Sequence, residues 1–120
     1  MIPNNMRELV AIRDGHRCAR CNVSILNQPS SVHHRKPRGM GGTKDPRAND
    51  PRNLIRLCGT GTTGCHGWVE SRRADAYSKG WLIRSYDDLD VPMLTITGDR
   101  IELRIDGTRL ESHNQGGEQK

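Results

Sequence analysis

The residues of this chain best suited to chemistry are two adjacent histidines, His33 and His34, together with Asn53 and His66. Imidazole nitrogens bind divalent metal ions, and histidine has the ordinary pKa of a general base that works near neutral pH. Neighbouring residues of a β-strand point to opposite faces, so one histidine of the pair can hold a metal while the other accepts a proton. Histidine pairs on strands are also common without any activity, and it is the combination with the other two residues that indicates metal-assisted chemistry.

Four cysteines enclose these residues and form two pairs. Cys18 and Cys21 have the two-residue spacing of a zinc knuckle, and six residues separate Cys58 from Cys65. Zinc binds four thiolates tetrahedrally, and glycines within the wider pair can adopt the positive φ angles that its longer loop needs. Free thiols or a disulfide are the alternatives. Four thiolates complete the shell of a zinc ion, so we expect a structural site that contributes about 10 kcal/mol to folding.

Composition indicates a small basic domain with a thin core. Only 32% of the 120 residues are hydrophobic, and the aromatic residues are two Trp and two Tyr. A metal site often supplements a core of this size. The net charge of +5 and the pI of about 9.4 suit a polyanionic partner. The sequence has no apolar run of membrane-spanning length and no signal-peptide pattern, so we expect a cytoplasmic protein with reduced cysteines and no membrane contact.

The elements that position these residues begin with a helix. Residues 5–14 have the apolar spacing of a short amphipathic helix. Asn4 or Asn5 is expected to cap its first turn, and Gly15 is expected to end it.

Two strands and a second helix are expected to carry the histidines. Residues 31–36 and 53–58 predict strands, joined by a loop over 37–52 that is rich in Gly, Pro and Asn. Residues 65–78 predict a helix that ends at Gly80. On that helix, residues four positions apart share one face.

The last third of the chain predicts a small antiparallel β meander. Residues 94–97 and 101–105 alternate apolar and polar side chains, and residues 98–99 and 106–107 are typical of turns. Residues 113–120 are polar and are expected to be disordered. Helices and antiparallel strands together predict an α+β fold.

Four motifs connect these features, and they occur in a fixed order. They are Cys18-x2-Cys21, the run VHHRKPRGMGG at residues 32–42, NLIRLC at 53–58 and GCHGWVE at 64–70. This order and spacing resembles the HNH endonucleases, also called His-Me finger or ββα-metal nucleases, and in particular small members from bacteriophages and prophages. The match runs from residue 18 to about residue 85, somewhat more than half of the chain, and leaves the C-terminal strands outside it.

The resemblance implies a single HNH nuclease domain over residues 1–120. Its ββα-metal core is expected over residues 18–80, stabilised by the four-cysteine zinc and preceded by the N-terminal helix. A C-terminal β extension over residues 81–112 and the tail over 113–120 complete the expected organisation.

The resemblance also assigns roles to the residues of the histidine constellation. His34 is the general base that activates water, and Asn53 orients the loop and His34 through side-chain hydrogen bonds. His33 and His66 are ligands of a catalytic divalent ion, Mg²⁺, Mn²⁺ or Ni²⁺, and His66 belongs to the catalytic set as the final histidine of the motif. Glu70 lies one helical turn beyond His66 and is a third ligand, either directly or through water.

Glu70 has a second candidate partner, because Arg73 lies three residues further along the same helix. Either role is open for this carboxylate. The implied reaction is phosphodiester hydrolysis with one divalent ion, leaving a 5′ phosphate.

Basic residues are expected to extend the site into a DNA-binding surface. They are Arg35, Lys36, Arg38, Lys44, Arg52, Arg56 and Arg73. Phosphate contacts of this kind supply affinity without sequence information. A solvated basic loop that binds nothing is the alternative.

The function that the resemblance implies is metal-dependent cleavage of double-stranded DNA, as a nick or a double-strand cut. Phage proteins of this kind are often associated with genome packaging, so the terminase large subunit is an expected partner, in the cytoplasm of a host bacterium. A monomer or a weak dimer is expected. Two alternatives stay open: a non-catalytic, zinc-stabilised DNA-binding module, which has no need of the histidines, and a homing or restriction enzyme, which usually carries a separate recognition domain.

Overall fold

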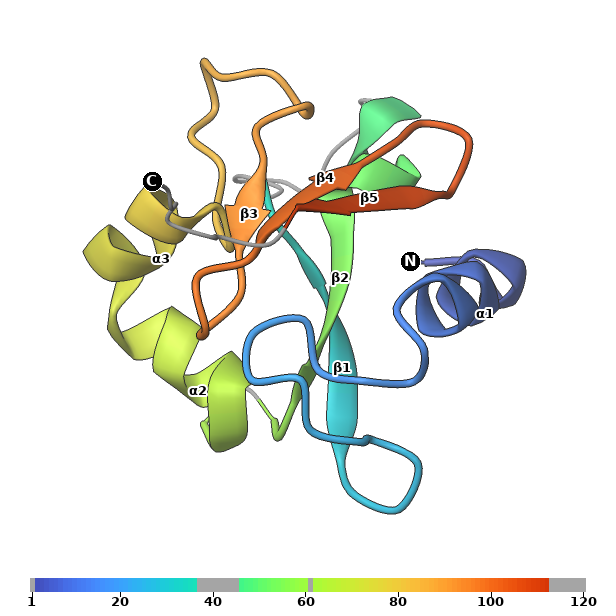
Figure 1. Cartoon of the computed structure of the whole chain (residues 1–120), viewed down its shortest axis with the longest axis vertical. Coiled ribbons are helices and arrows are strands. Elements are labelled where there is room, and N and C mark those ends of the chain that lie inside the picture. Colours follow the sequence, from blue (N-terminus) through green and yellow to red (C-terminus); the bar gives the residue numbers. More distant parts are fainter. Residues whose placement is uncertain (1, 37–45, 61, 113–120) are drawn as a thin grey trace.

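The computed structural model describes residues 2–36, 46–60 and 62–112, and these fold as a small α+β protein with three helices and two antiparallel sheets (Figure 1). The predicted α+β class is therefore confirmed. Among the described residues, no helix has the length and apolar character needed to cross a membrane. The tail over residues 113–120, for which disorder was predicted, lies outside the described residues.

A two-stranded hairpin forms the centre of the fold. Strand β1 (Ser30–His34) pairs antiparallel with strand β2 (Leu54–Cys58), in a register that sets His33 opposite Ile55 and His34 opposite Leu54. Both strands are somewhat shorter than predicted. Two short 3₁₀ turns, η1 (Pro46–Asn49) and η2 (Pro51–Asn53), lead into β2, within the segment expected to be loop.

The two faces of the hairpin pack against different helices, which lie on opposite sides of it in Figure 1. Ile55 and Leu57 are fully buried in the main core together with Val69 of helix α2 (Gly64–Ser71). Leu54 packs with Val10 of helix α1 (Asn4–Arg13) on the other face. Because strand residues alternate between faces, His33 lies on the α2 side and His34 on the α1 side.

Helix α1 differs from the prediction at its start. It begins at Asn4, and its N-cap is Pro3, so no asparagine side chain caps it. The carbonyl of Pro3 instead accepts hydrogen bonds from the backbone N–H groups of Met6 and Arg7. Proline is well suited to a helix start because it lacks the N–H group that the first turn would leave unpaired.

The single helix predicted over residues 65–78 is wrong, because the chain breaks it at Arg72. Helix α2 ends at Ser71 and helix α3 (Arg73–Lys79) follows at once, with Arg72 at φ −127° and ψ 61°. The hydroxyl of Ser71 donates to the carbonyl of Trp68 at 3.1 Å, a contact that competes with helical bonding and bends helices. Gly80 ends α3 in the left-handed conformation, as predicted.

The C-terminal strands form a second sheet in the order β3-β4-β5, comprising Met93–Leu94, Arg100–Leu103 and Arg109–Ser112. The meander is confirmed, but the strand predicted over 94–97 is mostly a turn in which Thr95 donates its N–H to the carbonyl of Asp99. Met93 and Ile101 pack in the same core as Trp81 and the hairpin. The C-terminal strands are therefore built onto the core that carries the histidines.

Candidate metal centres

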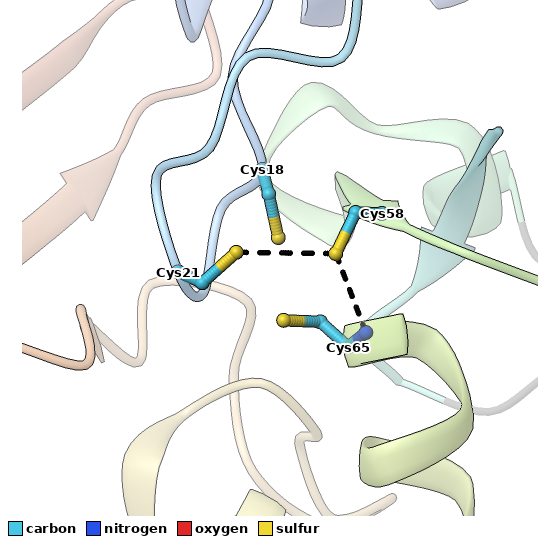
Figure 2. A group of neighbouring side chains, drawn as sticks. All are labelled: Cys18, Cys21, Cys58 and Cys65. Atoms are coloured by element: carbon cyan, nitrogen blue, oxygen red, sulfur yellow. Dashed lines mark hydrogen bonds between the residues drawn. The ribbon is translucent and has the colours of Figure 1, made fainter. Parts of the chain in front are cut away.

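The four cysteines converge from three parts of the fold (Figure 2). Cys18 and Cys21 lie in a knuckle after α1, Cys58 ends β2, and Cys65 lies in the first turn of α2. Their sulfur atoms all lie within 4.8 Å of one another, and none forms a disulfide. The Cys21 and Cys58 sulfurs are 3.9 Å apart. A tetrahedral zinc site with bonds of about 2.3 Å has sulfur–sulfur edges of about 3.8 Å, so the cluster fits a zinc ion.

Glycine closes the loop between Cys58 and Cys65. Gly59 and Gly64 have φ angles of 87° and 61°. A Cβ atom on Gly59 would lie 2.2 Å from the carbonyl oxygen of Thr63, and one on Gly64 would lie 2.6 Å from that of Cys58. Both the backbone angle and the lack of space exclude a side chain, which agrees with the role expected of glycine in this loop.

Hydrogen bonds within the cluster favour a thiolate, the form of cysteine that binds metal, at Cys18, whereas they raise the pKa of Cys65 and burial raises the pKa of Cys21. The Cys65 N–H lies 3.4 Å from the Cys58 sulfur, and hydrogen bonding from the Cys65 thiol lowers the pKa of Cys18 to about 4. Arg20 donates to the Cys65 sulfur at 3.3 Å, while its guanidinium lies 3.9 Å from the ring centre of Trp68. A fixed cation therefore adjoins a group that carries negative charge when its thiols ionise.

A second group of potential ligands lies between β1 and α2. His33, His66 and Glu70 each offer one ligand atom, and these atoms all lie within 4.8 Å of one another. The Oε2 atom of Glu70 is 3.8 Å from His33 Nδ1 and 3.7 Å from His66 Nε2. His33 is buried and Glu70 is exposed, so the group opens to solvent on its carboxylate side. The structure thus brings together the three residues expected to bind the divalent ion.

Both histidines have an outer hydrogen-bond partner that directs one nitrogen toward Glu70. His33 Nε2 lies 3.2 Å from the carbonyl oxygen of Trp81. A carbonyl only accepts, so Nε2 carries the proton and the electron pair of Nδ1 faces the carboxylate. Burial, and then the charge of His66, lower the pKa of His33 to about 4, so the ring is neutral near neutral pH. On His66, Nδ1 lies 2.6 Å from the hydroxyl of Ser31.

His34 lies on the other face of β1 and is outside this group of potential ligands. Its Nε2 atom is 3.2 Å from the side-chain oxygen of Asn49. Asn53 was expected to orient both the loop and His34. Its buried side chain accepts from the N–H of Lys36 and donates to the carbonyl of Ala48, so it holds the loop, and a contact to the His34 ring comes from Asn49.

Glu70 contacts both of the candidate partners left open by the sequence, Arg73 and the histidine group. Its Oε1 atom accepts from Arg73 at 3.1 Å, and its Oε2 atom faces the two histidines. One carboxylate can do this because its two oxygens point in different directions. The break at Arg72 does not separate the pair, which stays close as an i,i+3 contact.

Arg35 requires a correction, because the structure gives it a structural role in place of the expected phosphate contact. The residue is completely buried. Its guanidinium donates to three backbone carbonyls, those of Gly80, Arg52 and Val91. Burial lowers its pKa to about 9, which still leaves it charged near neutral pH. A guanidinium enclosed in this way cannot reach a phosphate.

The other basic residues expected on the DNA surface differ in how they are engaged. Lys36 reaches the carbonyls of Ser85 and Asp87, and Arg52 pairs with Asp50 at 2.9 Å. Of the other basic residues in this set that the structure describes, Arg56 donates to Ser30 and Arg73 is exposed. Arg38 and Lys44 lie outside the described residues.

Three contributors to these centres were not identified from the sequence. They are the Ser31 hydroxyl, the Trp81 carbonyl and the Arg20 guanidinium. A backbone carbonyl leaves no signature in the sequence. Ser31 was recognisable only in part, since it lies two residues before His33 and therefore on the same face of a strand.

In comparisons with known proteins, the chain matches no family model, no curated protein and no solved structure. What the two centres can do must therefore be argued from their own chemistry. Four thiols form a closed set that suits a tetrahedral structural ion, whereas two imidazoles and a carboxylate leave coordination positions open for water or substrate.

Proposed function

We propose that this protein is a metal-dependent endonuclease of the HNH type that hydrolyses phosphodiester bonds of double-stranded DNA. The observation that carries the proposal is the convergence of His33, His66 and Glu70 beside the four-cysteine cluster. The motif order implies this pairing of one thiolate centre and one imidazole–carboxylate centre. A protein that only binds DNA has no need of the second centre.

The chemistry of the donors divides the two metals between the two centres. Thiolates favour zinc, and the four-cysteine cluster is a structural zinc site that holds the knuckle, β2 and α2 together. Imidazole and carboxylate suit Mg²⁺, Mn²⁺ or Ni²⁺, for which His33, His66 and Glu70 are the ligands. The divalent ion supplies Lewis-acid charge neutralisation at the phosphoryl group and at the departing oxygen.

His34 acts as the general base. It takes a proton from the attacking water as the water oxygen bonds to phosphorus and the bond from phosphorus to the 3′ oxygen breaks; the departing oxygen takes up a proton from solvent water, leaving a 5′ phosphate and a 3′ hydroxyl. The amide oxygen of Asn49, 3.2 Å from His34 Nε2, orients the imidazole ring. Asn53 contributes by holding the loop that carries Asn49 against the strand.

The charge of the protein supports a nucleic acid as the substrate. The net charge is +5, and Arg73 is an exposed cation bonded to Glu70 at the rim of the histidine group. Neutralised phosphates release counterions, so we expect affinity for DNA to fall steeply as salt is raised. Weak sequence preference is part of the proposal, because contacts to phosphates carry no sequence information.

A plasmid cleavage assay tests the proposal. Supercoiled DNA is incubated with the zinc-loaded protein in Mg²⁺, Mn²⁺ or Ni²⁺, or in EDTA, and nicked and linear products are separated. The wild type is compared with His34→Asn and with His16→Asn, which makes the same substitution at an exposed histidine that belongs to neither group of candidate ligands. His16 has a φ of 57°, a conformation that asparagine tolerates, so this control keeps its fold.

We expect metal-dependent cleavage by the wild type and by His16→Asn, and a loss of about 100-fold or more in His34→Asn. Cleavage that persists in EDTA, or equal activity in both variants, would contradict the proposal. A wild type that binds DNA but cuts it with none of the three metals would favour the DNA-binding module instead.

A further inference from the structure

We propose that Ser31 is a positioning residue for the divalent centre, fixing the ring of His66 so that Nε2 faces the metal. The inference rests on the proposed function, since it concerns the ligands of the ion described there. Its basis is the contact of 2.6 Å between the Ser31 hydroxyl and His66 Nδ1, the shortest polar contact made by any of the three ligands.

The direction of the hydrogen bonds follows from what each atom can donate. A serine hydroxyl has one proton to donate and two electron pairs that accept. The Ser31 hydroxyl also lies 3.5 Å from the carbonyl of Gly59, which can only accept. We assign the hydroxyl proton to Gly59 and let Ser31 accept the proton of His66 Nδ1, because this is the arrangement in which the hydroxyl uses both contacts. The electron pair of His66 is left on Nε2, which lies 3.7 Å from Glu70.

The register of the hairpin explains why this serine reaches the site. Ser31 lies opposite Leu57, on the face that packs on α2, and His33 is the next residue along that face. Ser30 lies on the opposite face, where its hydroxyl accepts from Arg56 at 2.9 Å. Two neighbouring serines thus differ only in the face that they occupy.

The contact also connects the two metal centres. Gly59, which accepts from Ser31, directly follows the ligand Cys58, and His66 directly follows the ligand Cys65. Hydrogen bonds from outer partners typically raise metal affinity 10-fold to 100-fold by fixing the ligand's tautomer and orientation. Ser31 therefore contacts both the loop between Cys58 and Cys65 and the His66 ring of the proposed divalent centre.

The test compares Ser31→Ala, Ser31→Thr and the matched control Ser30→Ala, all zinc-loaded. Mn²⁺ affinity is measured by calorimetry, because Mn²⁺ does not displace zinc from thiolates. The tautomer of His66 is read separately, without Mn²⁺, from its ¹⁵N chemical shifts. We expect about a tenfold or greater loss of Mn²⁺ affinity in Ser31→Ala, wild-type affinity in Ser30→Ala and recovery in Ser31→Thr, which restores the hydroxyl.

The ¹⁵N shifts should show a proton on Nδ1 of His66 in the wild type and a mixture of tautomers in Ser31→Ala. Equal affinities and shifts in Ser31→Ala and Ser30→Ala would overturn the inference while leaving the nuclease proposal intact. A wild type that binds no Mn²⁺ would overturn the divalent centre itself, and the ¹⁵N shifts would still decide whether Ser31 sets the tautomer.

Discussion

Replacing Arg35 with methionine distinguishes a structural arginine from a DNA contact. The guanidinium is fully buried and donates at 2.9 Å to the carbonyls of Gly80 and Arg52, and also to that of Val91. None of the ion pairs among the described residues involves it, and the three carbonyl dipoles solvate the charge. Methionine has a similar length and no donors, so Arg35→Met removes the hydrogen bonds while keeping most of the packing.

The size of the effect follows from these contacts. Each carbonyl left without a donor costs about 1–3 kcal/mol, which gives about 3–9 kcal/mol for three. Removing a buried charge returns several kcal/mol of desolvation free energy. We therefore expect the free energy of unfolding of Arg35→Met to fall by about 2–4 kcal/mol, and the melting temperature to fall by about 10 °C for a chain of this length.

Thermal and urea unfolding of the zinc-loaded protein, followed by circular dichroism, measure this loss. Arg104→Met is the matched control, because Arg104 is exposed, and we expect its stability to stay within about 0.5 kcal/mol of the wild type. DNA affinity is measured in parallel at several salt concentrations. If Arg35→Met kept wild-type stability but bound DNA more weakly with a shallower salt dependence, the arginine would contact a phosphate and the reasoning from burial would be refuted.

Two further predictions concern the four-cysteine cluster. The purified protein should contain one zinc ion per chain, and Cys58→Ser should lose both this zinc and the cooperative unfolding transition, as measured by metal analysis and calorimetry; a zinc-free variant with wild-type stability would contradict the structural role. Arg20→Met should release zinc to a chelator faster than the wild type by about tenfold, because Arg20 donates to the Cys65 sulfur. Arg17→Met, in the same knuckle, should match the wild type, since Arg17 bonds only the backbone carbonyl of Asn22 among its described contacts, and equal release from both variants would remove the proposed role of Arg20.

Sequence reasoning located the ligand groups because local spacing determines most of their geometry. Two residues between Cys18 and Cys21 suffice for a knuckle, and four positions along a helix place His66 and Glu70 on one face. The alternation of a strand likewise separates His33 from its neighbour. These are short-range rules, so they do not depend on how the rest of the chain packs.

Sequence reasoning failed where long-range packing decides the outcome. Arg35 looked like part of a basic loop, yet it contacts carbonyls 17, 45 and 56 residues away, and no local pattern indicates such partners. The end of α2 at Ser71 could not be predicted, because neither glycine nor proline occurs at residues 71–73. The contact of Asn49 with His34 could not be predicted in preference to one from Asn53, because both asparagines lie in the segment leading into β2.

The segment after α3 belongs to the candidate site, although none of the four sequence motifs includes it. The Trp81 carbonyl sets which nitrogen of His33 faces Glu70. The adjacent Gly80 carbonyl is held by Arg35, whose own carbonyl in turn accepts from Ile83. Gly80 can adopt its position only without a side chain, because a Cβ atom there would lie 2.2 Å from the carbonyl oxygen of Pro92.

These contacts give a reason for a buried arginine, and not an apolar residue, at position 35. A buried charge with no carboxylate partner among the described residues is an energetically costly way to join two segments, and an apolar residue of similar volume would join them at lower cost. The arginine adds orientation, because the N–H groups of its planar guanidinium have fixed directions and determine where the bonded carbonyls point. One of those carbonyls is next in the chain to the carbonyl that orients His33. A loss of stability in Arg35 variants and a change in the orientation of the His33 ring should therefore appear together.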